Sequence, residues 1–474
     1  MGLAPGTGLG ACEILSPIGA GGIEMPGGRE LAELIRGRRI SAREVMAEHL
    51  GRINQRNPTL NAIVAKLDDE KCLALADEAD KKLARGEDVG PLHGLPWAFK
   101  DLEDAIGFPW TSGSPIFKDR IATTDSPLVA LLRRAGVIPI GKTNVPEFGM
   151  GSHTYNKVYG TTRNPYDTTK SAGGSSGGAA AALATGMLPL ADGSDYGGSL
   201  RNPANFNGIV ALRPSGGVAP ALGETEWLGL NVKGPMARTV ADTAFLFSVM
   251  LGEQYWPSAL SLSKGLDRDL KGVRVAWCPD LGGLPLHRRV RAVLDSRRRT
   301  FEALGCIVED AGPDLTDADD IFLTTRRRRS FVNLGGLLNA HRAQMKPEAV
   351  DEIERGARVS ESDIAEATAK HARLLARVGA FFDRYAFLIC AVNQVPPFDA
   401  EIDWPHEIEG VKMEHYCAWM KSTYWISATR CPAASVPAGR TPEGLPVGMQ
   451  IVGRHGDDRG VLELAYAVEQ FGRT

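Results

Sequence analysis

The sequence predicts an α/β fold: a mixed, mostly parallel, twisted β-sheet sandwiched between helical layers, with a helical insertion or cap. Two observations support it. From about residue 90, short apolar runs broken by Gly and Pro alternate with helical segments, which is typical of a sheet covered on both faces. From about 314 to 425, long polar helices dominate and indicate the insertion. Residues 23–474 are therefore expected to form one domain, preceded by a flexible Gly- and Pro-rich arm at residues 1–22.

The elements follow in chain order. Helices begin near Arg29, and Ser41 with Glu44 three residues later forms a capping box for the second one. Strands are predicted at 95–99, 137–140, 187–191, 273–277, 306–309, 387–392 and 447–452. Helices are predicted between them, among others at 126–134, 177–184 and 239–250.

Composition excludes several classes of protein. With 43% hydrophobic and 23% charged residues, the chain can bury a large core. Its formal charge of −3 argues against nucleic-acid or anionic-membrane partners. Seven scattered cysteines without a C-x-x-C pair indicate neither a disulfide framework nor a zinc site, so we expect no metal and a cytoplasmic location. The oligomeric state stays open, with a homodimer among the options.

Two glycine-rich blocks carry the chemistry. Gly173 to Gly178 surrounds Ser175, and Ser199 follows two glycines just before a predicted helix start. Peptide N–H groups at a helix start lack intrahelical partners and can stabilise an oxyanion. A phosphate-binding loop is disfavoured because Ala179, not Lys, follows the last glycine of the first block.

A serine nucleophile needs a base, and Lys100 is the best candidate. His93 and His153 lack a matching acid in a Gly-rich turn and are expected to be structural. Lys100 ends a buried strand, where α/β sheets place their sites, and a desolvated lysine can lose its proton near neutral pH.

These residues resemble the amidase signature family over nearly the whole chain. The likeness is densest at 91–216, in the GLPWAFKD strand, the GKTNVPEFG segment, the GGSSGG block and the GSDYGGSLRNPA block. The resemblance implies a hydrolase that cuts amide C–N bonds through an acyl-enzyme. It assigns Ser199 as nucleophile, Ser175 as proton bridge after a cis Gly174–Ser175 peptide, and Lys100 as base, with no cofactor.

The same resemblance implies the surroundings of the triad. Backbone N–H groups of Tyr196, Gly197, Gly198 and Ser199 would form the oxyanion hole. Three supporting residues are expected around it: Ser176, Asp195 and Arg201. Tyr196 departs from the smaller residue usual in the family, and Arg213 replaces a usual lysine, a change expected to affect packing only.

The substrate pocket is sought in the least patterned segments, 217–231 and 390–425. They offer apolar, aromatic and amide side chains: Trp227, Leu228, Gln394, Val395, Pro396, Pro397, Phe398, Trp404 and Trp419. Aromatic and proline-rich walls favour small apolar or aryl amides over glutamine, and the urethanase branch of the family adds carbamates. Gln394 could equally hold its own loop together. Two alternatives remain: a glutaminase subunit of a tRNA-dependent amidotransferase, and a catalytically silent binding protein on the same fold.

Overall fold

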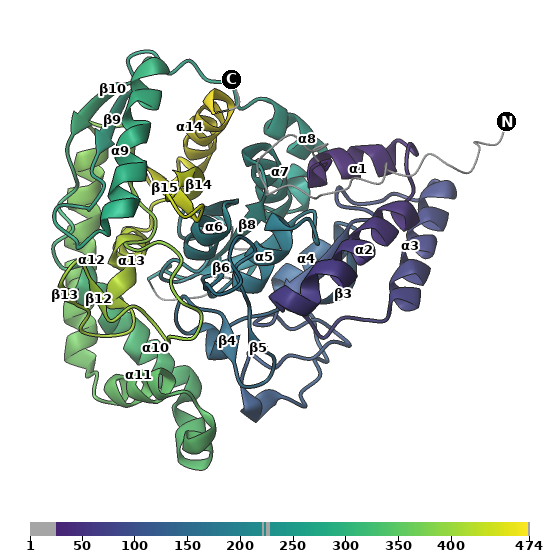
Figure 1. Cartoon of the computed structure of the whole chain (residues 1–474), viewed down its shortest axis with the longest axis horizontal. Helices are drawn as coiled ribbons and strands as arrows, with labels where there is room; N and C mark the ends of the chain where they lie inside the picture. The colour runs from purple at the N-terminus through teal and green to yellow at the C-terminus, as the bar shows by residue number, and fades with distance from the viewer. Residues whose placement is uncertain (1–24, 220–221, 224–227, 473–474) are drawn as a thin grey trace.

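A computed structural model describes residues 25–219, 222–223 and 228–472, so the arm predicted at residues 1–22 lies outside the described residues (Figure 1). The helices of this part are α1 (Gly28–Arg36), α2 (Ala42–Leu60), α3 (Asp69–Ala84), α4 (Pro127–Arg134), α5 (Gly177–Ala184), α6 (Arg201–Asn207), α7 (Val240–Met250), α8 (Trp256–Lys264), α9 (Arg288–Ala303), α10 (Ala318–His341), α11 (Pro347–Ala357), α12 (Glu361–Phe382), α13 (Lys421–Ala428) and α14 (Asp458–Phe471). Its strands are β1 (Ile63–Val64), β2 (Pro96–Lys100), β3 (Ile138–Thr143), β4 (Tyr155–Asn156), β5 (Gly160–Thr161), β6 (Ala191–Asp195), β7 (Val210–Arg213), β8 (Val232–Ala237), β9 (Arg274–Trp277), β10 (Ile307–Asp310), β11 (Phe387–Ala391), β12 (Glu407–Ile408), β13 (Val411–Lys412), β14 (Ala433–Arg440) and β15 (Pro446–Gly453).

The main sheet of the described residues has eight strands in the order β10-β9-β11-β15-β14-β7-β8-β6. It is mixed, as predicted, but the expectation that it is mostly parallel is wrong. Only β10–β9 and β9–β11 are parallel, and the other neighbouring strands run antiparallel. One reason is local: residues 441–445 join β14 to β15, and a parallel crossover needs a dozen residues or more.

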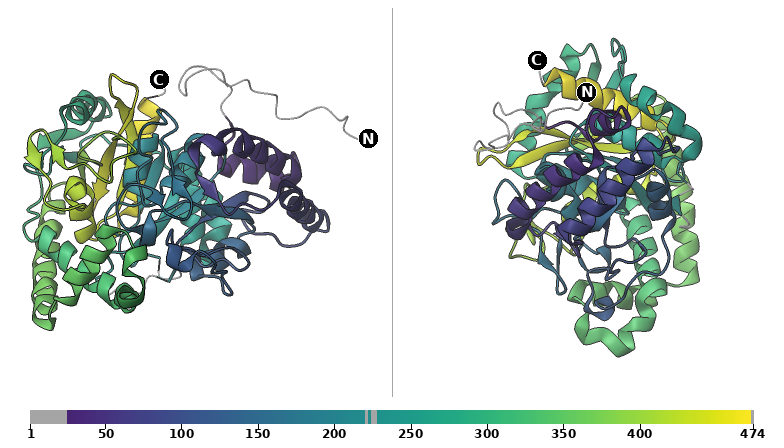
Figure 2. Two further views of the ribbon diagram at one scale, coloured as in Figure 1. Left: turned by 60° about the horizontal axis from the view of Figure 1, so that its bottom comes forward. Right: turned by 90° about the vertical axis from the view of Figure 1, so that its right-hand side faces the viewer.

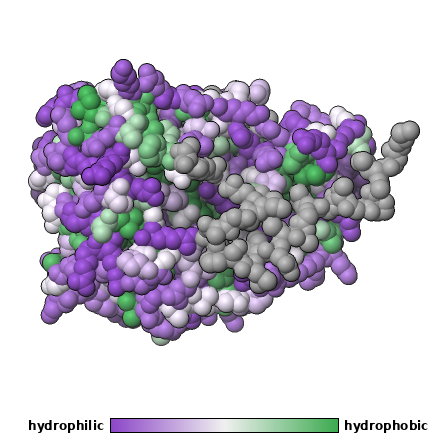
Figure 3. All heavy atoms as spheres, turned by 45° about the horizontal axis from the view of Figure 1, so that its top comes forward, coloured by the Kyte–Doolittle hydropathy of each residue, from purple (hydrophilic) through white to green (hydrophobic). Residues whose placement is uncertain are grey.

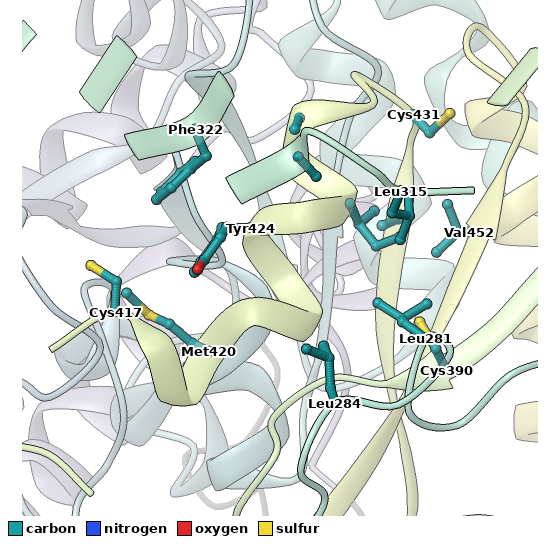
Figure 4. Close-up of a cluster of buried hydrophobic side chains, with 14 of the residues drawn as sticks. Leu281, Leu284, Leu315, Phe322, Cys390, Cys417, Met420, Tyr424, Cys431 and Val452 are labelled. Atoms are coloured by element: carbon teal, nitrogen blue, oxygen red, sulfur yellow. The ribbon is translucent and has the colours of Figure 1, made fainter. Parts of the chain in front are cut away.

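Apolar residues alternate between the two faces of this sheet. Leu388 and Cys390 of β11 pack with α10, α12 and α13 on one face. Phe387 and Ile389 pack with α9 and α14 on the other. Figure 4 shows part of the first cluster, in which Phe322 and Tyr424 stack with ring centroids 4.3 Å apart. The strands therefore lie between helical layers, as the sequence predicted.

The N-terminal third of the chain contains a second, smaller sheet with the strand order β1-β3-β2. The capping box at the start of α2 is confirmed: the Glu44 N–H donates to Ser41 Oγ (3.1 Å) and the Ser41 N–H to Glu44 Oε2 (2.8 Å). Figure 2 shows these N-terminal helices at the end of the molecule opposite α10 to α12.

The helical segment is shorter than predicted. Helices α10 to α12 end at Phe382, and β11 then enters the main sheet between β9 and β15. The predicted boundary near residue 425 is therefore wrong, because the chain returns to the core before the loop that leads to α13.

Apolar residues on the face seen in Figure 3 are scattered among hydrophilic ones. The most exposed large apolar side chains, such as Val332 on α10 and Ile121 in a loop, come from different elements. Isolated exposure of this kind is ordinary for a globular protein.

Candidate active site

Lys100 is the last residue of β2, a strand that is buried throughout. Its side chain is 1% exposed. Register pairs Lys100 with Thr143 of the parallel strand β3, so both side chains leave the same face of the small sheet. The sequence prediction that a buried strand would deliver this lysine at its end is confirmed.

Three serine hydroxyls surround the Lys100 ammonium. Nζ donates to Ser175 Oγ at 2.9 Å, to Ser176 Oγ at 2.8 Å and to Ser194 Oγ at 2.9 Å. No carboxylate of the described residues lies within ion-pair distance of Nζ. Burial lowers the pKa of Lys100 to about 7, and the more distant Asp192 offsets only part of that shift.

Ser194 was missed by the sequence analysis. A signal for it existed, because β6 alternates and places Asp192 and Ser194 on one face of the strand. Asp192 accepts from Trp97 Nε1 (2.8 Å) and from the Lys100 N–H (3.3 Å). Thus β6 contributes two groups that hold the end of β2.

The Gly174–Ser175 peptide is cis, as the resemblance implied. Ser175 is 2% exposed, and Ser176 directly precedes α5. The Ser176 N–H donates to the Ser199 carbonyl at 3.2 Å, which ties the first glycine-rich block to the second.

Ser199 is half-buried and lies two residues before α6. Among the described residues, its hydroxyl makes no hydrogen bond, with Ser175 or any other group. Of the two contacts that the predicted triad requires, the Lys100–Ser175 hydrogen bond is therefore formed, and the Ser175–Ser199 hydrogen bond is not.

The turn before Ser199 corrects one member of the predicted oxyanion hole. The Gly198 N–H donates to Asp195 Oδ1 at 2.8 Å, so it is not free for an oxyanion. The carboxylate takes this donor because it caps the turn, also accepting from the Leu200 N–H at 3.3 Å. Within the part of the chain that the structure describes, the N–H groups of Gly197 and Ser199 have no acceptor.

Both glycines of this turn are required by close packing. A Cβ on Gly197 would lie 2.7 Å from Phe322 Cζ, and one on Gly198 would lie 2.4 Å from Thr423 Oγ1. Gly198 also has φ +125°, which side-chain-bearing residues rarely adopt. The N–H groups of the turn are therefore held by a backbone that admits no side chain here.

Asp195 is held by two arginines. Arg201 donates to both carboxylate oxygens at 2.9 Å, and Arg213 Nη1 donates to Oδ1 at 3.2 Å and to the Asp195 carbonyl. Burial alone would raise the pKa of Asp195, but the two guanidinium groups bring it well below its usual value. The expectation that Arg213 affects packing only is wrong, because its long side chain reaches the aspartate from β7.

The family model for amidases matches residues 44–462. The chain belongs to the amidase family. It is similar to an acylamidase of Rhodococcus erythropolis, with 34% identity over 92% of this chain and 93% of the relative. It is also 31% identical to a glutamyl-tRNA(Gln) amidotransferase subunit of Alkaliphilus metalliredigens, over 91% of this chain and 94% of that one.

Solved structures agree with this membership. A bacterial aryl acylamidase of the amidase signature family superposes with a TM-score of 0.86 and 28% identity, over 94% of this chain and 96% of the other. A 6-aminohexanoate cyclic dimer hydrolase gives 0.80 and 25%, over 94% and 97%. The chain is thus a hydrolase of the amidase family, on the fold that its relatives share.

The predictions of pocket residues in this amidase are less successful than those of the triad. Trp227 lies outside the described residues. The prediction that Gln394 lines the substrate pocket is wrong. Gln394 is 1% exposed, its Nε2 donates to the Pro285 carbonyl (3.0 Å) and its Oε1 accepts from the Ser422 N–H (3.4 Å), so it joins its own loop to the Pro285 loop and to the start of α13. A buried amide satisfied on both sides has little left to offer a ligand.

Pro397 is buried and Phe398 is half-buried. The Phe398 ring meets His153 and Trp419 edge-on, with centroids 5.5 and 5.3 Å apart. Those two partners, not Phe398, line a pocket of the amidase, together with residues from the loop after β3 and the start of α11. Sequence reasoning named two of its walls, Trp404 and Trp419, but missed the others because they lie far away along the chain.

Among the described residues of the amidase, His, Cys, Asp and Glu form no group of three or more that could hold a metal ion. No helix of that same part is long and apolar enough to cross a membrane.

Proposed function

We propose that this amidase hydrolyses small apolar or aryl amides through an acyl-enzyme on Ser199. The observation that carries the proposal is the buried Lys100 side chain, whose Nζ contacts three hydroxyls and no carboxylate of the described residues. A lysine with a pKa of about 7 is neutral in a large fraction of molecules at neutral pH. It can then accept the Ser175 proton while Ser175 takes the proton of Ser199.

In the acylation step, Ser199 Oγ attacks the amide carbon and its proton passes through Ser175 to Lys100. The carbonyl oxygen becomes an oxyanion, which would accept hydrogen bonds from the N–H groups of Gly197 and Ser199. The C–N bond then breaks as the proton returns from Lys100 through Ser175 to the leaving nitrogen. A water molecule then attacks the ester of the acyl-enzyme, with Ser175 and Lys100 again transferring the proton. This second step releases the carboxylic acid product and regenerates Ser199.

Asp195 and its two arginines position this turn. Charge-assisted hydrogen bonds from Arg201 and Arg213 fix the carboxylate, and the carboxylate fixes the Gly198 and Leu200 N–H groups. We assign these three side chains a supporting role, since their hydrogen bonds hold the backbone that carries Ser199.

The substrate class rests on two supports. The acylamidase and aryl acylamidase relatives span almost the whole chain. The pocket that adjoins the first glycine-rich block includes the rings of Tyr155, Trp404, Tyr416 and Trp419. Aryl carbamates share the planar carbonyl and the aromatic leaving group, and we include them in the proposal.

The test is to purify the chain alone and assay anilides, aliphatic amides, carbamates and glutamine. We expect anilide hydrolysis without any partner, loss of it in Ser199→Ala, and labelling of Ser199 by a serine-directed fluorophosphonate. Labelling confined to another residue would remove Ser199 from the mechanism.

The amidotransferase relatives support a second candidate, a glutaminase that works within an assembly. Turnover of glutamine only, and only after a partner is added, would favour it over the amide hydrolase.

A further inference from the structure

A pocket beside the proposed active site contains charged groups that the mechanism does not use. Its walls come from three segments: the loop after β3, the start of α11, and the loop between β11 and α13. Its unused charged groups are Lys346 and Glu348 at the start of α11, and Asp403.

The pocket adjoins the glycine-rich blocks directly. A Cβ on Gly174 would lie 3.0 Å from the N atom of His153, a pocket residue. Asn202, three residues after Ser199, donates from Nδ2 to Ser152 Oγ at 2.7 Å on the same wall. The wall of this pocket therefore packs directly against both glycine-rich blocks.

Lys346 brings to the pocket a buried ammonium group without an ion-pair partner among the described residues, and burial lowers its pKa. The residue is 7% exposed, and its Nζ donates to the Met150 carbonyl and lies 5.7 Å from the Tyr155 ring centroid. No carboxylate of the described residues forms an ion pair with it. A nearby acid, Glu147, uses its Oε2 for the Lys346 main-chain N–H (2.7 Å) and its Oε1 for Ser114 (2.7 Å). Two ammonium protons are thus left without a charged or polar acceptor in the described part.

Glu348 contributes the opposite group. Its Oε2 is buried and has no hydrogen-bond partner among the described residues. The other carboxylate of the pocket, Asp403, already accepts from the Trp404 N–H (2.8 Å) and from His406 Nε2 (2.9 Å). An unmatched donor and an unmatched acceptor therefore line one pocket, two residues apart in sequence, without forming an ion pair with each other.

Leaving two protons of the Lys346 ammonium and the Glu348 Oε2 atom buried without partners costs free energy unless a ligand matches them. A carboxylate alone would match Lys346 but repel Glu348, and an ammonium alone would do the reverse. A planar carboxamide or ureido group offers an oxygen to one and an N–H to the other without bringing a further charge among the aromatic rings.

We propose that this pocket binds a second, uncharged amide-type group of the substrate, with its oxygen on Lys346 and its N–H on Glu348. The inference rests on the proposed amide hydrolysis and narrows its substrate to amides that carry such a group at the end away from the scissile bond.

The experiment compares isosteric pairs of anilides. On the acyl side, the 4-nitroanilide of succinamic acid is paired with that of 4-methylpentanoic acid. On the leaving side, acetanilide with a 4-carbamoyl group is paired with 4-isopropylacetanilide. The enzymes are wild type, Lys346→Met, Glu348→Gln and, as a control at a half-buried position of α11 outside the pocket, Glu354→Gln. The γ-glutamyl 4-nitroanilide tests a zwitterionic head group.

In one of the two series, we expect wild type and Glu354→Gln to prefer the carboxamide by about tenfold in kcat/KM, the value of one charge-assisted hydrogen bond. Lys346→Met should lose that preference through KM. Glu348→Gln should lose part of it, because its amide oxygen still accepts the N–H but carries no charge. Both variants should turn over the apolar partner at the wild-type rate. Glu348→Gln, a change of one atom at a half-buried site, keeps the test open if Lys346→Met does not fold.

No preference in either series would overturn the proposal, as would equal losses on both members of a pair or a preference for the γ-glutamyl substrate. Each of these results leaves amide hydrolysis by Ser199 intact. Absence of hydrolysis for every anilide would instead refute the proposed function itself.

Discussion

Lys100 and Lys142 are two buried lysines on neighbouring strands with different surroundings. Register pairs Phe99 with Lys142 and Lys100 with Thr143, so the two lysines point to opposite faces of the small sheet. Burial lowers the pKa of both. Lys100 contacts three hydroxyls, whereas Lys142 donates to the Glu103 carbonyl and lies 3.9 Å from Asp101.

The difference shows that burial alone does not make a lysine a base. A hydroxyl can both accept a proton and give one, so Ser175 can carry a proton toward Lys100. A carbonyl oxygen has no proton to give, and the Asp101 carboxylate favours the charged form of Lys142. Lys142 is thus equipped to hold β3 in place, and Lys100 to take part in proton transfer.

The largest effect should come from replacing each lysine in turn. We expect Lys100→Met to lower anilide hydrolysis by about 10²–10⁴-fold, the usual contribution of a general base. Lys142→Met should lower the melting temperature, because it leaves Asp101 buried without a cation, yet keep near-wild-type kcat per folded molecule. Rates are normalised to folded protein by circular dichroism. Wild-type turnover in the Lys100→Met variant would show that Lys100, like Lys142, is not needed for catalysis.

The next largest effect should come from replacing Ser175 or Ser176, whose hydroxyls both accept a hydrogen bond from the Lys100 ammonium. Ser175→Ala should slow anilide hydrolysis by about 10²-fold, the low end for a proton-transfer group, and slow an activated ester much less, since its leaving group needs no proton. Ser176→Ala is the matched control and should affect amide and ester alike. Equal losses of ester and amide activity in Ser175→Ala would contradict the bridging role.

The pH profile separates the lysines without mutation. Lys100 must be neutral to accept a proton, so protonation below its pKa of about 7 inactivates it. The value of kcat/KM for an anilide should therefore fall about tenfold per pH unit below that point and level off above it. Lys142 takes no part and should add no second inflection. Activity that is flat or rises toward acid pH would exclude Lys100 as the base.

The smallest effect should follow from Ser194→Ala. Three hydroxyls accept the three ammonium protons of Lys100, and removal of one disfavours the charged form. The midpoint of the pH profile should move to lower pH by a fraction of a unit, with a gain in activity near pH 6. A shift to higher pH would mean that Ser194 stabilises the neutral amine instead.

Sequence alone determined the local features of this protein. Helix caps, the run of the buried strand that ends at Lys100 and the glycine-rich turns around Ser175 and Ser199 depend on neighbouring residues, and each lies where it was predicted. The family likeness then supplied the cis peptide and the triad assignment, which composition and spacing could not.

Only the tertiary structure decided which strands pair and which side chains meet across the chain. Strands β7, β8 and β14 were not predicted. Strand β7 pairs antiparallel with β8, 25–27 residues away, and with β14, 220–224 residues away. Arg213 reaches Asp195 from β7, and Ser194 reaches Lys100 from β6. The pocket at Lys346 combines residues 150–155, 346–348 and 403–419. Periodicity in a sequence reports which face of an element is buried, but it holds no information about the partner that buries it.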